Sequence, residues 1–182
     1  MNAARSRLLV VIGAVGLLTI GSLTFVSLAQ GRFGGSPGLA LATCGPSQPQ
    51  GQVVRVTLDD RGGGMMGGAN SMMVSLYATP TNVTRGTITF VATNVGALNH
   101  ELLILPAPAD GTGTRSTGSN GKIDESSSLG EASTSCGRGP GQGVTPGTTS
   151  WITLHLPPGN YELLCDEPWH YANGMFAAFT VK

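Results

Sequence analysis

The sequence predicts an all-β domain, a β-sandwich with Greek-key connections, which follows an apolar N-terminal segment. About seven short segments with alternating or β-branched residues recur after residue 51, separated by turn residues. Glycine is abundant, at 28 residues, and suits turns and loops better than long helices. The chain also contains no coiled-coil heptads and no internal repeat.

The expected strands run from residue 52 to the end of the chain. Their ranges are Gln52–Leu58, Ser71–Ala78, Thr87–Asn94, His100–Leu105, Trp151–Leu156, Tyr161–Cys165 and Met175–Val181. In the third range, Ile88, Phe90 and Ala92 share one face, which predicts that they point in the same direction. The fourth ends at Pro106, because proline cannot donate a hydrogen bond within a sheet.

Residues 107–149 lie between the fourth and fifth strands and are dominated by Gly, Ser and Thr. We expect a long insertion that runs over the surface, with a short helical turn around Ile123–Ala132. A loop of this length inside a small domain is generally functional or tied down. Cys136 lies within it and is the residue that would tie it.

The N-terminus predicts export from the cytoplasm. Arg5 and Arg7 precede an uncharged run of 22 residues, Leu8–Ala29. That length favours a membrane anchor over a cleaved signal peptide, whose apolar region usually has about 7–15 residues. Small residues at Ser27 and Ala29 keep cleavage open as the alternative.

The chain therefore divides into three parts. Residues 1–30 are a signal anchor or signal peptide, residues 31–50 a flexible linker rich in Gly, Pro and Ser, and residues 51–182 the folded domain. Everything after residue 30 is expected outside the cytoplasm, in the periplasm or on the outer face of the cell membrane. Cleavage would make this part a secreted protein.

The charge distribution excludes one class of partner. The chain has ten basic and ten acidic residues, a formal net charge of zero, and 11% charged residues. Nucleic-acid binding needs clustered Lys and Arg to neutralise phosphates, whereas the basic residues here are scattered singly. We expect no nucleic-acid partner.

Three cysteines follow the apolar segment. An odd number in an exported chain predicts one disulfide and one thiol with another task. Cys165 lies among metal-binding residue types, so Cys44 and Cys136 are the candidate disulfide. The alternative is that Cys44 carries a lipid, because the residues before it loosely resemble a lipobox.

The stretch from Cys165 to Met175 carries the chemistry. It places a thiolate, the imidazole of His170 and a thioether on one loop between two expected strands. Two histidines and one cysteine in a trigonal plane, with a weak axial methionine, are the ligand set of blue copper. The second histidine must come from elsewhere, and His100 fits because it follows a loop and opens an apolar strand. The sequence therefore predicts one copper ion held by these four residues.

The spacing Cys-x4-His-x4-Met, with Pro168 inside it and Gly174 before the methionine, resembles the C-terminal ligand loop of single-domain cupredoxins. The resemblance is to the rusticyanin, auracyanin and sulfocyanin type above all. The segment from Thr89 to Glu101 resembles that family's strand, Asn-x-Gly turn and first histidine ligand. Pro157–Cys165 resembles its approach to the cysteine ligand.

This resemblance, over roughly residues 51–182, implies a cupredoxin-like fold and a function without catalysis. The chain would carry single electrons between redox proteins of the cytochrome or terminal oxidase type through one type 1 copper. It would take no small-molecule substrate, and the membrane would be a partner through the N-terminal segment.

The chain departs from the family around the ligands. Asn99 and Glu101 flank the first histidine, where relatives often have Asn or Ser after it. Trp169 precedes the loop histidine, where relatives often have Gly. Groups around the ligands tune a bound metal, so these residues are expected to affect the reduction potential. Trp169, with Tyr171 and Phe176, is also expected to form an apolar patch that contacts a redox partner.

A copper chaperone or storage protein is the alternative function. Met65, Met66, Met72 and Met73 offer the soft thioether ligands that Cu(I) prefers. The buried thiolate expected at Cys165 argues against this alternative, since such proteins bind Cu(I) through exposed side chains.

A copper enzyme would need additional histidine pairs, and the chain has only three histidines. The third, His155, lies on the polar face of its strand and is expected at the surface. Asp166 and Glu167 are neighbours on the ligand loop, and we expect them to be solvated, with no catalytic role.

Overall fold

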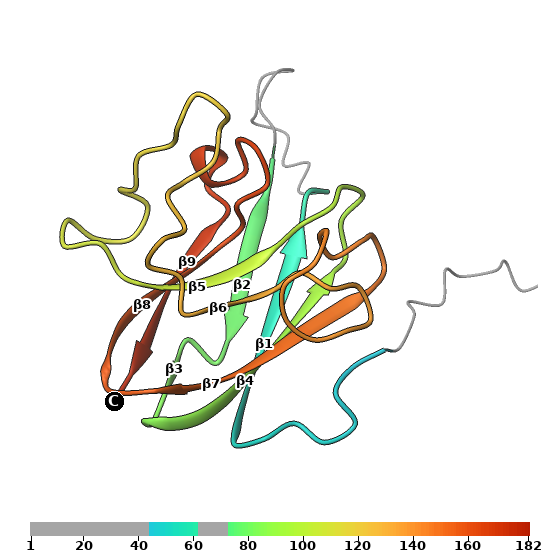
Figure 1. Ribbon diagram of the computed structural model, residues 1–182, viewed down its shortest axis with the longest axis vertical. Helices are drawn as coiled ribbons and strands as arrows, with labels where there is room; N and C mark the ends of the chain where they lie inside the picture. The colour runs from blue at the N-terminus through green and yellow to red at the C-terminus, as the bar shows by residue number, and fades with distance from the viewer. Residues whose placement is uncertain (1–43, 62–72) are drawn as a thin grey trace, which may run out of the picture. The chain divides into compact units, whose positions relative to one another are not determined.

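Nine strands in two sheets form the described part of the chain, which comprises residues 44–61 and 73–182 of a computed structural model (Figure 1). One sheet has the strand order β2-β1-β4-β7 and the other β3-β9-β8-β5-β6. The strands are β1 (Gln52–Asp59), β2 (Ser75–Thr79), β3 (Asn82–Val83), β4 (Gly86–Asn94), β5 (Leu102–Pro106), β6 (Gly130–Ala132), β7 (Thr149–Leu156), β8 (Gly159–Leu164) and β9 (Phe176–Val181). A short 3-10 helix, η1 (Tyr171–Asn173), precedes β9.

Both sheets are mixed. β1 is parallel to β4 and β3 is parallel to β9, whereas the other neighbouring strands are antiparallel. The chain crosses to the five-stranded sheet for β3 and returns for β4. It crosses again for β5 and β6, returns for β7 and ends in the five-stranded sheet with β8 and β9. The predicted all-β sandwich is confirmed.

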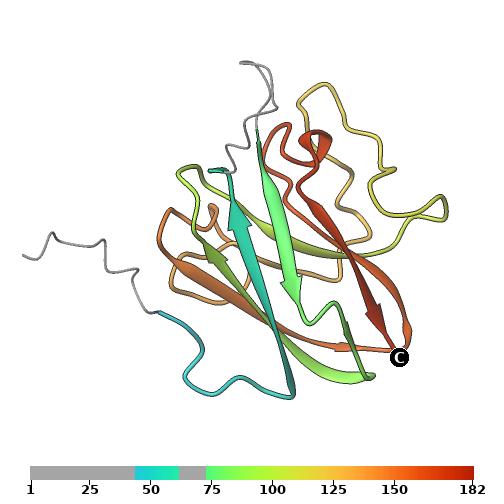
Figure 2. The same ribbon diagram turned by 180° about the vertical axis from the view of Figure 1, so that it is seen from behind.

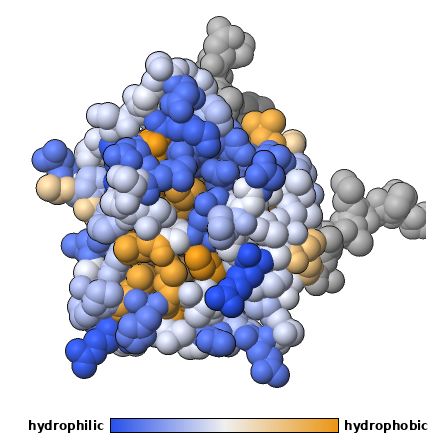
Figure 3. All heavy atoms as spheres, in the orientation of Figure 1, coloured by the Kyte–Doolittle hydropathy of each residue, from blue (hydrophilic) through white to orange (hydrophobic). Residues whose placement is uncertain are grey.

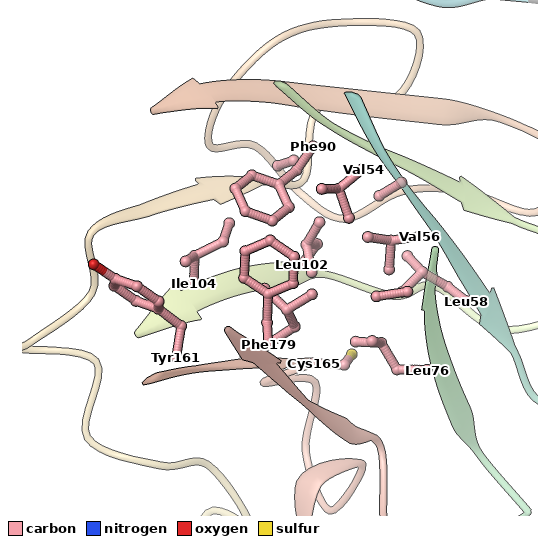
Figure 4. Close-up of a cluster of buried hydrophobic side chains, with 14 of the residues drawn as sticks. Val54, Val56, Leu58, Leu76, Phe90, Leu102, Ile104, Tyr161, Cys165 and Phe179 are labelled. Carbon is pink, nitrogen blue, oxygen red and sulfur yellow. The ribbon is translucent and has the colours of Figure 1, made fainter. Parts of the chain in front are cut away.

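The core lies between the two sheets and is built by residue alternation along the strands (Figure 4). In β4, Ile88, Phe90 and Ala92 are fully buried in it, as their spacing predicted. Across the interface, Phe90 of β4 meets Phe179 of β9 edge-to-face, with ring centroids 5.2 Å apart. Cys165 belongs to the same cluster.

The five-stranded sheet is buried on both faces in its central strands. Along β5, Leu102 and Ile104 join the core between the sheets, whereas Leu103 and Leu105 point the other way. The outward pair packs in a second cluster with Leu164 and with Ile123 of the long insertion. A strand covered on both sides reads as a continuous apolar run, which explains the sequence of β5.

The two ends of the sandwich differ. In both views the loop that contains η1 lies at one end and the C-terminus at the other (Figures 1 and 2). β8 runs between these ends, so its last residue, Leu164, delivers Cys165 to the end that contains η1.

An apolar groove lies toward the opposite end. It is lined mainly by Pro106, Leu129, Leu154, Leu156, Pro157 and Tyr161. Figure 3 shows apolar side chains gathered in this region, over β6, β7 and β8. His155 is exposed beside it, which agrees with its expected surface position.

The insertion differs from the prediction. No helical turn forms at Ile123–Ala132; instead Gly130–Ala132 is strand β6, which pairs antiparallel with β5. Gly, Glu and Ala are poor strand formers, so local sequence preference does not explain β6. The strand forms because the edge of β5 is free to pair with it. A two-residue strand, β3, also occurs in the predicted turn region between β2 and β4.

Several predictions lie outside the described residues. They are the signal anchor or signal peptide at 1–30, most of the linker at 31–50, and the methionine-containing stretch 62–72. Within residues 44–61 and 73–182, no helix has the length and apolar character needed to cross a membrane.

The edge-to-face pair between the sheets gives a test of the core. We expect Phe179→Ala to lower the free energy of unfolding by about 3–5 kcal/mol, because it removes a buried ring and leaves a cavity. Tyr77→Ala on β2 is the control: Tyr77 is 63% exposed, and its change should stay within about 0.5 kcal/mol. Urea denaturation measures both, and equal losses in the two variants would contradict this arrangement of the sheets.

Candidate metal centre

His100 is held just before β5 by a network around Asn94, at the end of β4. The side-chain amide of Asn94 donates to the carbonyl oxygens of Leu98 at 2.7 Å and Val144 at 2.6 Å. Its oxygen accepts the N–H of Gly96 at 2.8 Å. The backbone of His100 pairs with Val144 in both directions, at 3.3 and 2.7 Å. One buried amide therefore shapes the turn that presents this imidazole.

A carboxylate closes the same turn from outside. Asp60, directly after β1, accepts the N–H groups of Ala97 at 2.5 Å and Leu98 at 2.7 Å. Neither Asn94 nor Asp60 was predicted as a residue of the site. The Asn-x-Gly pattern was a usable signal for Asn94, whereas Asp60 is brought in from β1 by long-range folding.

The other candidate ligands come from the loop between β8 and β9. Its two ends are joined by the N–H of Cys165, which donates to the carbonyl oxygen of Met175 at 3.1 Å. The N–H of Met175 in turn donates to the carbonyl oxygen of His170, also at 3.1 Å. These backbone bonds pull the three residues together, and Gly174, with a φ of 94°, provides the left-handed turn before the methionine.

The three strong donors converge. The ligand atoms of His100, Cys165 and His170 all lie within 4.8 Å of one another, and all three residues are buried. The two Nδ1 atoms are 3.2 Å apart, and the Cys165 sulfur is 4.0 Å from Nδ1 of His100 and 3.4 Å from that of His170. Among the described residues this is the one such cluster.

This triangle has room for one metal ion. A point in its plane lies about 2.1 Å from all three atoms, close to the roughly 2.0–2.3 Å that zinc keeps to imidazole nitrogen and thiolate sulfur. Nδ1 of His100 is the nitrogen that lies near the other donors, whereas its Nε2 is buried and has no hydrogen-bond partner among the described residues. The donor set therefore fits a bound ion.

Met175 completes the set. It is fully buried and belongs to the same apolar cluster as Cys165. Its backbone is bonded to both Cys165 and His170, as described above. The four residues His100, Cys165, His170 and Met175 are thus clustered as in a blue copper site.

Burial sets the protonation of the donors in the metal-free protein. It lowers the pKa of His100 to about 4, with the neighbouring His170 acting in the same direction, and it also lowers the pKa of His170. Burial raises the pKa of the Cys165 thiol to about 12, against the N–H of Glu101, which donates to the sulfur at 3.2 Å. The negative charge of Asp60 partly opposes this lowering of the pKa of both histidines. At neutral pH both rings are uncharged and can bind a metal.

The residues that flank the ligands have distinct positions. Asn99 is exposed, whereas Glu101 is half-buried and its backbone reaches the Cys165 sulfur. Burial raises the pKa of the Glu101 carboxyl to about 7, an effect that Lys122 opposes. The hydrogen bond to the sulfur comes from the backbone, so it does not need the Asn or Ser that many cupredoxins have at this position.

Trp169 has an unusual backbone conformation. Its φ is 70°, in the left-handed region that costs a residue other than glycine about 1–3 kcal/mol. This explains why glycine suits the position. The N–H of Trp169 donates to the carbonyl oxygen of Gly121 at 2.9 Å, and the indole ring lies against Gly121, where a Cβ would come within 2.8 Å of it. Half of the Trp169 surface is exposed.

Two predictions about the loop are wrong. Asp166 is not solvated: it is 1% exposed, and its Oδ1 accepts the N–H of Ile123 at 2.7 Å. Tyr171 is 2% exposed and packs with Phe176 against the outer face of the sheet, so Tyr171 contributes nothing to an exposed apolar patch. In both cases the long insertion buries a side chain that was expected to be exposed.

Cys44 and Cys136 are joined by a disulfide, with their Cα atoms 5.1 Å apart. The bond ties the start of the described chain to the insertion, 92 residues further on. A disulfide uses the sulfur that a lipid would need, so this structure does not accommodate lipidation at Cys44.

No protein-family model matches the chain, and no curated protein matches it either. Its neighbours among solved structures include reduced auracyanin from Roseiflexus castenholzii, with 20% identity over 72% of this chain and 96% of that one and a TM-score of 0.47. Rusticyanin from Thiobacillus ferrooxidans shows 17% identity over 72% and 79%, with a TM-score of 0.45. Auracyanin A from Chloroflexus aurantiacus, a blue copper protein, shows 16% over 71% and 99%, with a TM-score of 0.43. At these values, what this chain binds has to be inferred from its own residues.

The low pKa of His100 makes stability depend on pH. Unfolding restores the ordinary value of 6.5, so the unfolded metal-free chain binds an additional proton between about pH 6.5 and 4, and stability falls as the pH falls. Across this window, we expect the metal-free wild type to lose about 3 kcal/mol more in its free energy of unfolding than the His100→Gln variant loses. Urea denaturation at several pH values measures the difference between the two proteins, in which the contributions of the other ionisable groups cancel. A constant difference between the two proteins would show that His100 is not held neutral.

Proposed function

We propose that this chain is an electron carrier that binds one type 1 copper ion through His100, Cys165, His170 and Met175. The observation that carries the proposal is the triangle of two imidazole nitrogens and one sulfur, with a common point about 2.1 Å from each. Copper bound there would supply the Cu(I)/Cu(II) couple for single-electron transfer. Two imidazoles, one thiolate and a thioether favour copper over zinc, which prefers four strong tetrahedral ligands.

The protein would fix one ligand arrangement for both oxidation states. Its donors are held by backbone hydrogen bonds and by the core, so they have little freedom to rearrange when the charge of the site changes. The N–H of Glu101 points at the sulfur and would stabilise the thiolate. The thiol has to release its proton to a bound metal, as ligand cysteines do.

The imidazole of His170 is the proposed path for electrons. His100, Cys165 and Met175 are each 0% exposed, whereas His170 is 5% exposed. Trp169, 50% exposed, adjoins it in the chain, and Leu98, 43% exposed, lies in the turn before His100. Small apolar surfaces of this kind suit brief contact with another protein. We propose redox partners of the cytochrome or terminal oxidase type.

We also propose that the domain works outside the cytoplasm, attached to the membrane by Leu8–Ala29 unless this segment is cleaved. The length of that uncharged run supports an anchor. The Cys44–Cys136 bond supports an oxidising compartment, because disulfides are rare in the cytosol. The proposal includes no catalytic step: two of the three histidines are candidate ligands, and His155, on β7, does not belong to their cluster.

Loading the full-length chain with one equivalent of Cu(II) tests the function. We expect the intense visible thiolate-to-Cu(II) absorption band of blue copper, and we expect Cys165→Ser to abolish it, because a hydroxyl cannot supply that charge transfer. The matched control is the double variant Cys44→Ser/Cys136→Ser, which replaces sulfur with oxygen away from the site and should retain the band. A wild type that binds only Cu(I), without colour, would point to the chaperone or storage alternative.

A further inference from the structure

The first half of the long insertion, residues 107–129, covers the outer face of the five-stranded sheet at the metal end. We name these residues the covering segment. Its Ile123 is buried against Leu103 and Leu164, and the same cluster contains Tyr171 from the ligand loop. The covering segment and the ligand loop therefore pack on one another as well as on the sheet.

Hydrogen bonds join the covering segment to the ligand loop at three points. They run from Trp169 N–H to the Gly121 carbonyl oxygen at 2.9 Å, from Ile123 N–H to Asp166 Oδ1 at 2.7 Å, and from Arg115 N–H to the Tyr171 hydroxyl oxygen at 3.0 Å. The loop residues in these bonds lie directly after Cys165 and on both sides of His170. Motion of either candidate ligand would therefore strain contacts with the covering segment.

The third point continues into a buried charged network. The side chain of Glu162, on β8, is 0% exposed, and its carboxylate accepts the Nε–H of Arg115 at 2.5 Å and the N–H of Gly113 at 2.7 Å. The Tyr171 hydroxyl donates to the same carboxylate at 3.1 Å. A second guanidinium nitrogen of Arg115 donates to the Pro106 carbonyl oxygen. A buried carboxylate is tolerated only when it is paired and hydrogen-bonded in this way.

The Tyr171 hydroxyl thus has a partner on each side, Arg115 as donor to it and Glu162 as acceptor from it. Its ring is 2% exposed and lies 5.1 Å from that of Phe176. Tyr171 directly follows His170 and begins η1, so a fixed ring at this position restricts the backbone that carries the imidazole.

We propose that the covering segment positions the metal ligands, with Tyr171 as the positioning residue that links the Arg115–Glu162 pair to His170. The inference rests on the proposed function, because it assigns the covering segment the role of holding the copper ligands in place. It does not depend on copper for its test.

Tyr171→Phe is the test variant and Tyr161→Phe the matched control. Both remove the hydroxyl of a buried tyrosine and keep its ring. Tyr161 donates to the Pro157 carbonyl oxygen at 2.8 Å, at the start of β8 and away from the ligands. Comparing the two separates a positioning role from a general loss of stability.

In the metal-free full-length chain, amide hydrogen exchange is measured for His170–Met175. We expect Tyr171→Phe to accelerate exchange there on the order of tenfold, as the loss of hydrogen bonds that restrain a local opening would do. Tyr161→Phe should leave these amides unchanged. Equal exchange in the ligand loop of both variants would overturn the proposal.

With Cu(II) added, we expect Tyr171→Phe to weaken binding on the order of tenfold, as is typical when a group that orients a ligand is lost, and to alter the visible spectrum. Tyr161→Phe should bind and absorb like the wild type, and unchanged affinity and spectrum in Tyr171→Phe would count against positioning. If Tyr171→Phe does not fold, Glu162→Gln, which keeps the shape but removes the charge that pairs with Arg115, is read by the same two measurements with the same outcomes. A colourless wild type would defeat the proposed function, whereas the exchange comparison would still decide the role of the covering segment.

Discussion

The antiparallel pairing of β5 with β8 determines where the candidate ligands lie. Leu103 is opposite Leu164, so Cys165 follows on the inner face of the sheet, at the end where His100 precedes β5. A slip of one residue would turn Cys165 to the outer face and bring Leu164 inward, because side chains alternate along a strand. Glu162 prevents this slip, since its charged side chain would leave Arg115 and enter the apolar core. The triangle of donors is thus a consequence of sheet register.

A second consequence is that the outer face needs its own cover. The side chains that point away from the main core are those of Leu103, Leu105 and Leu164. Glu162 lies on the same face, opposite Leu105. Residues 107–129 bury this face with few large apolar side chains of their own, using Ile123 as an anchor and Arg115 to pair with the buried carboxylate. The same residues reach the ligand loop, so the burial of a sheet face and the arrangement of the site are coupled.

The sequence predicts the site better than it predicts the surroundings of the site. Three residue types that bind soft metal ions lie within eleven residues, at Cys165, His170 and Met175. His100 lies at the start of a strand, which its flanking residues indicate. Strands with alternation, such as β4, were predicted within one residue at each end. In contrast, β6 forms from Gly130–Ala132 only because the edge of β5 is free, and the partners Arg115 and Glu162 are 47 residues apart without any local pattern. The burial of Asp166 and Tyr171 follows from the same long-range packing, which periodicity does not reveal.

We propose that two imidazole nitrogens and one thiolate sulfur, which come from separate segments, bind one copper ion. X-ray absorption at the copper edge of the loaded full-length chain tests it most directly. We predict one sulfur and two nitrogen scatterers at bonding distance, roughly 2.0–2.3 Å if the lengths resemble those of zinc sites. A first shell made only of oxygen and nitrogen, with no sulfur, would contradict the account.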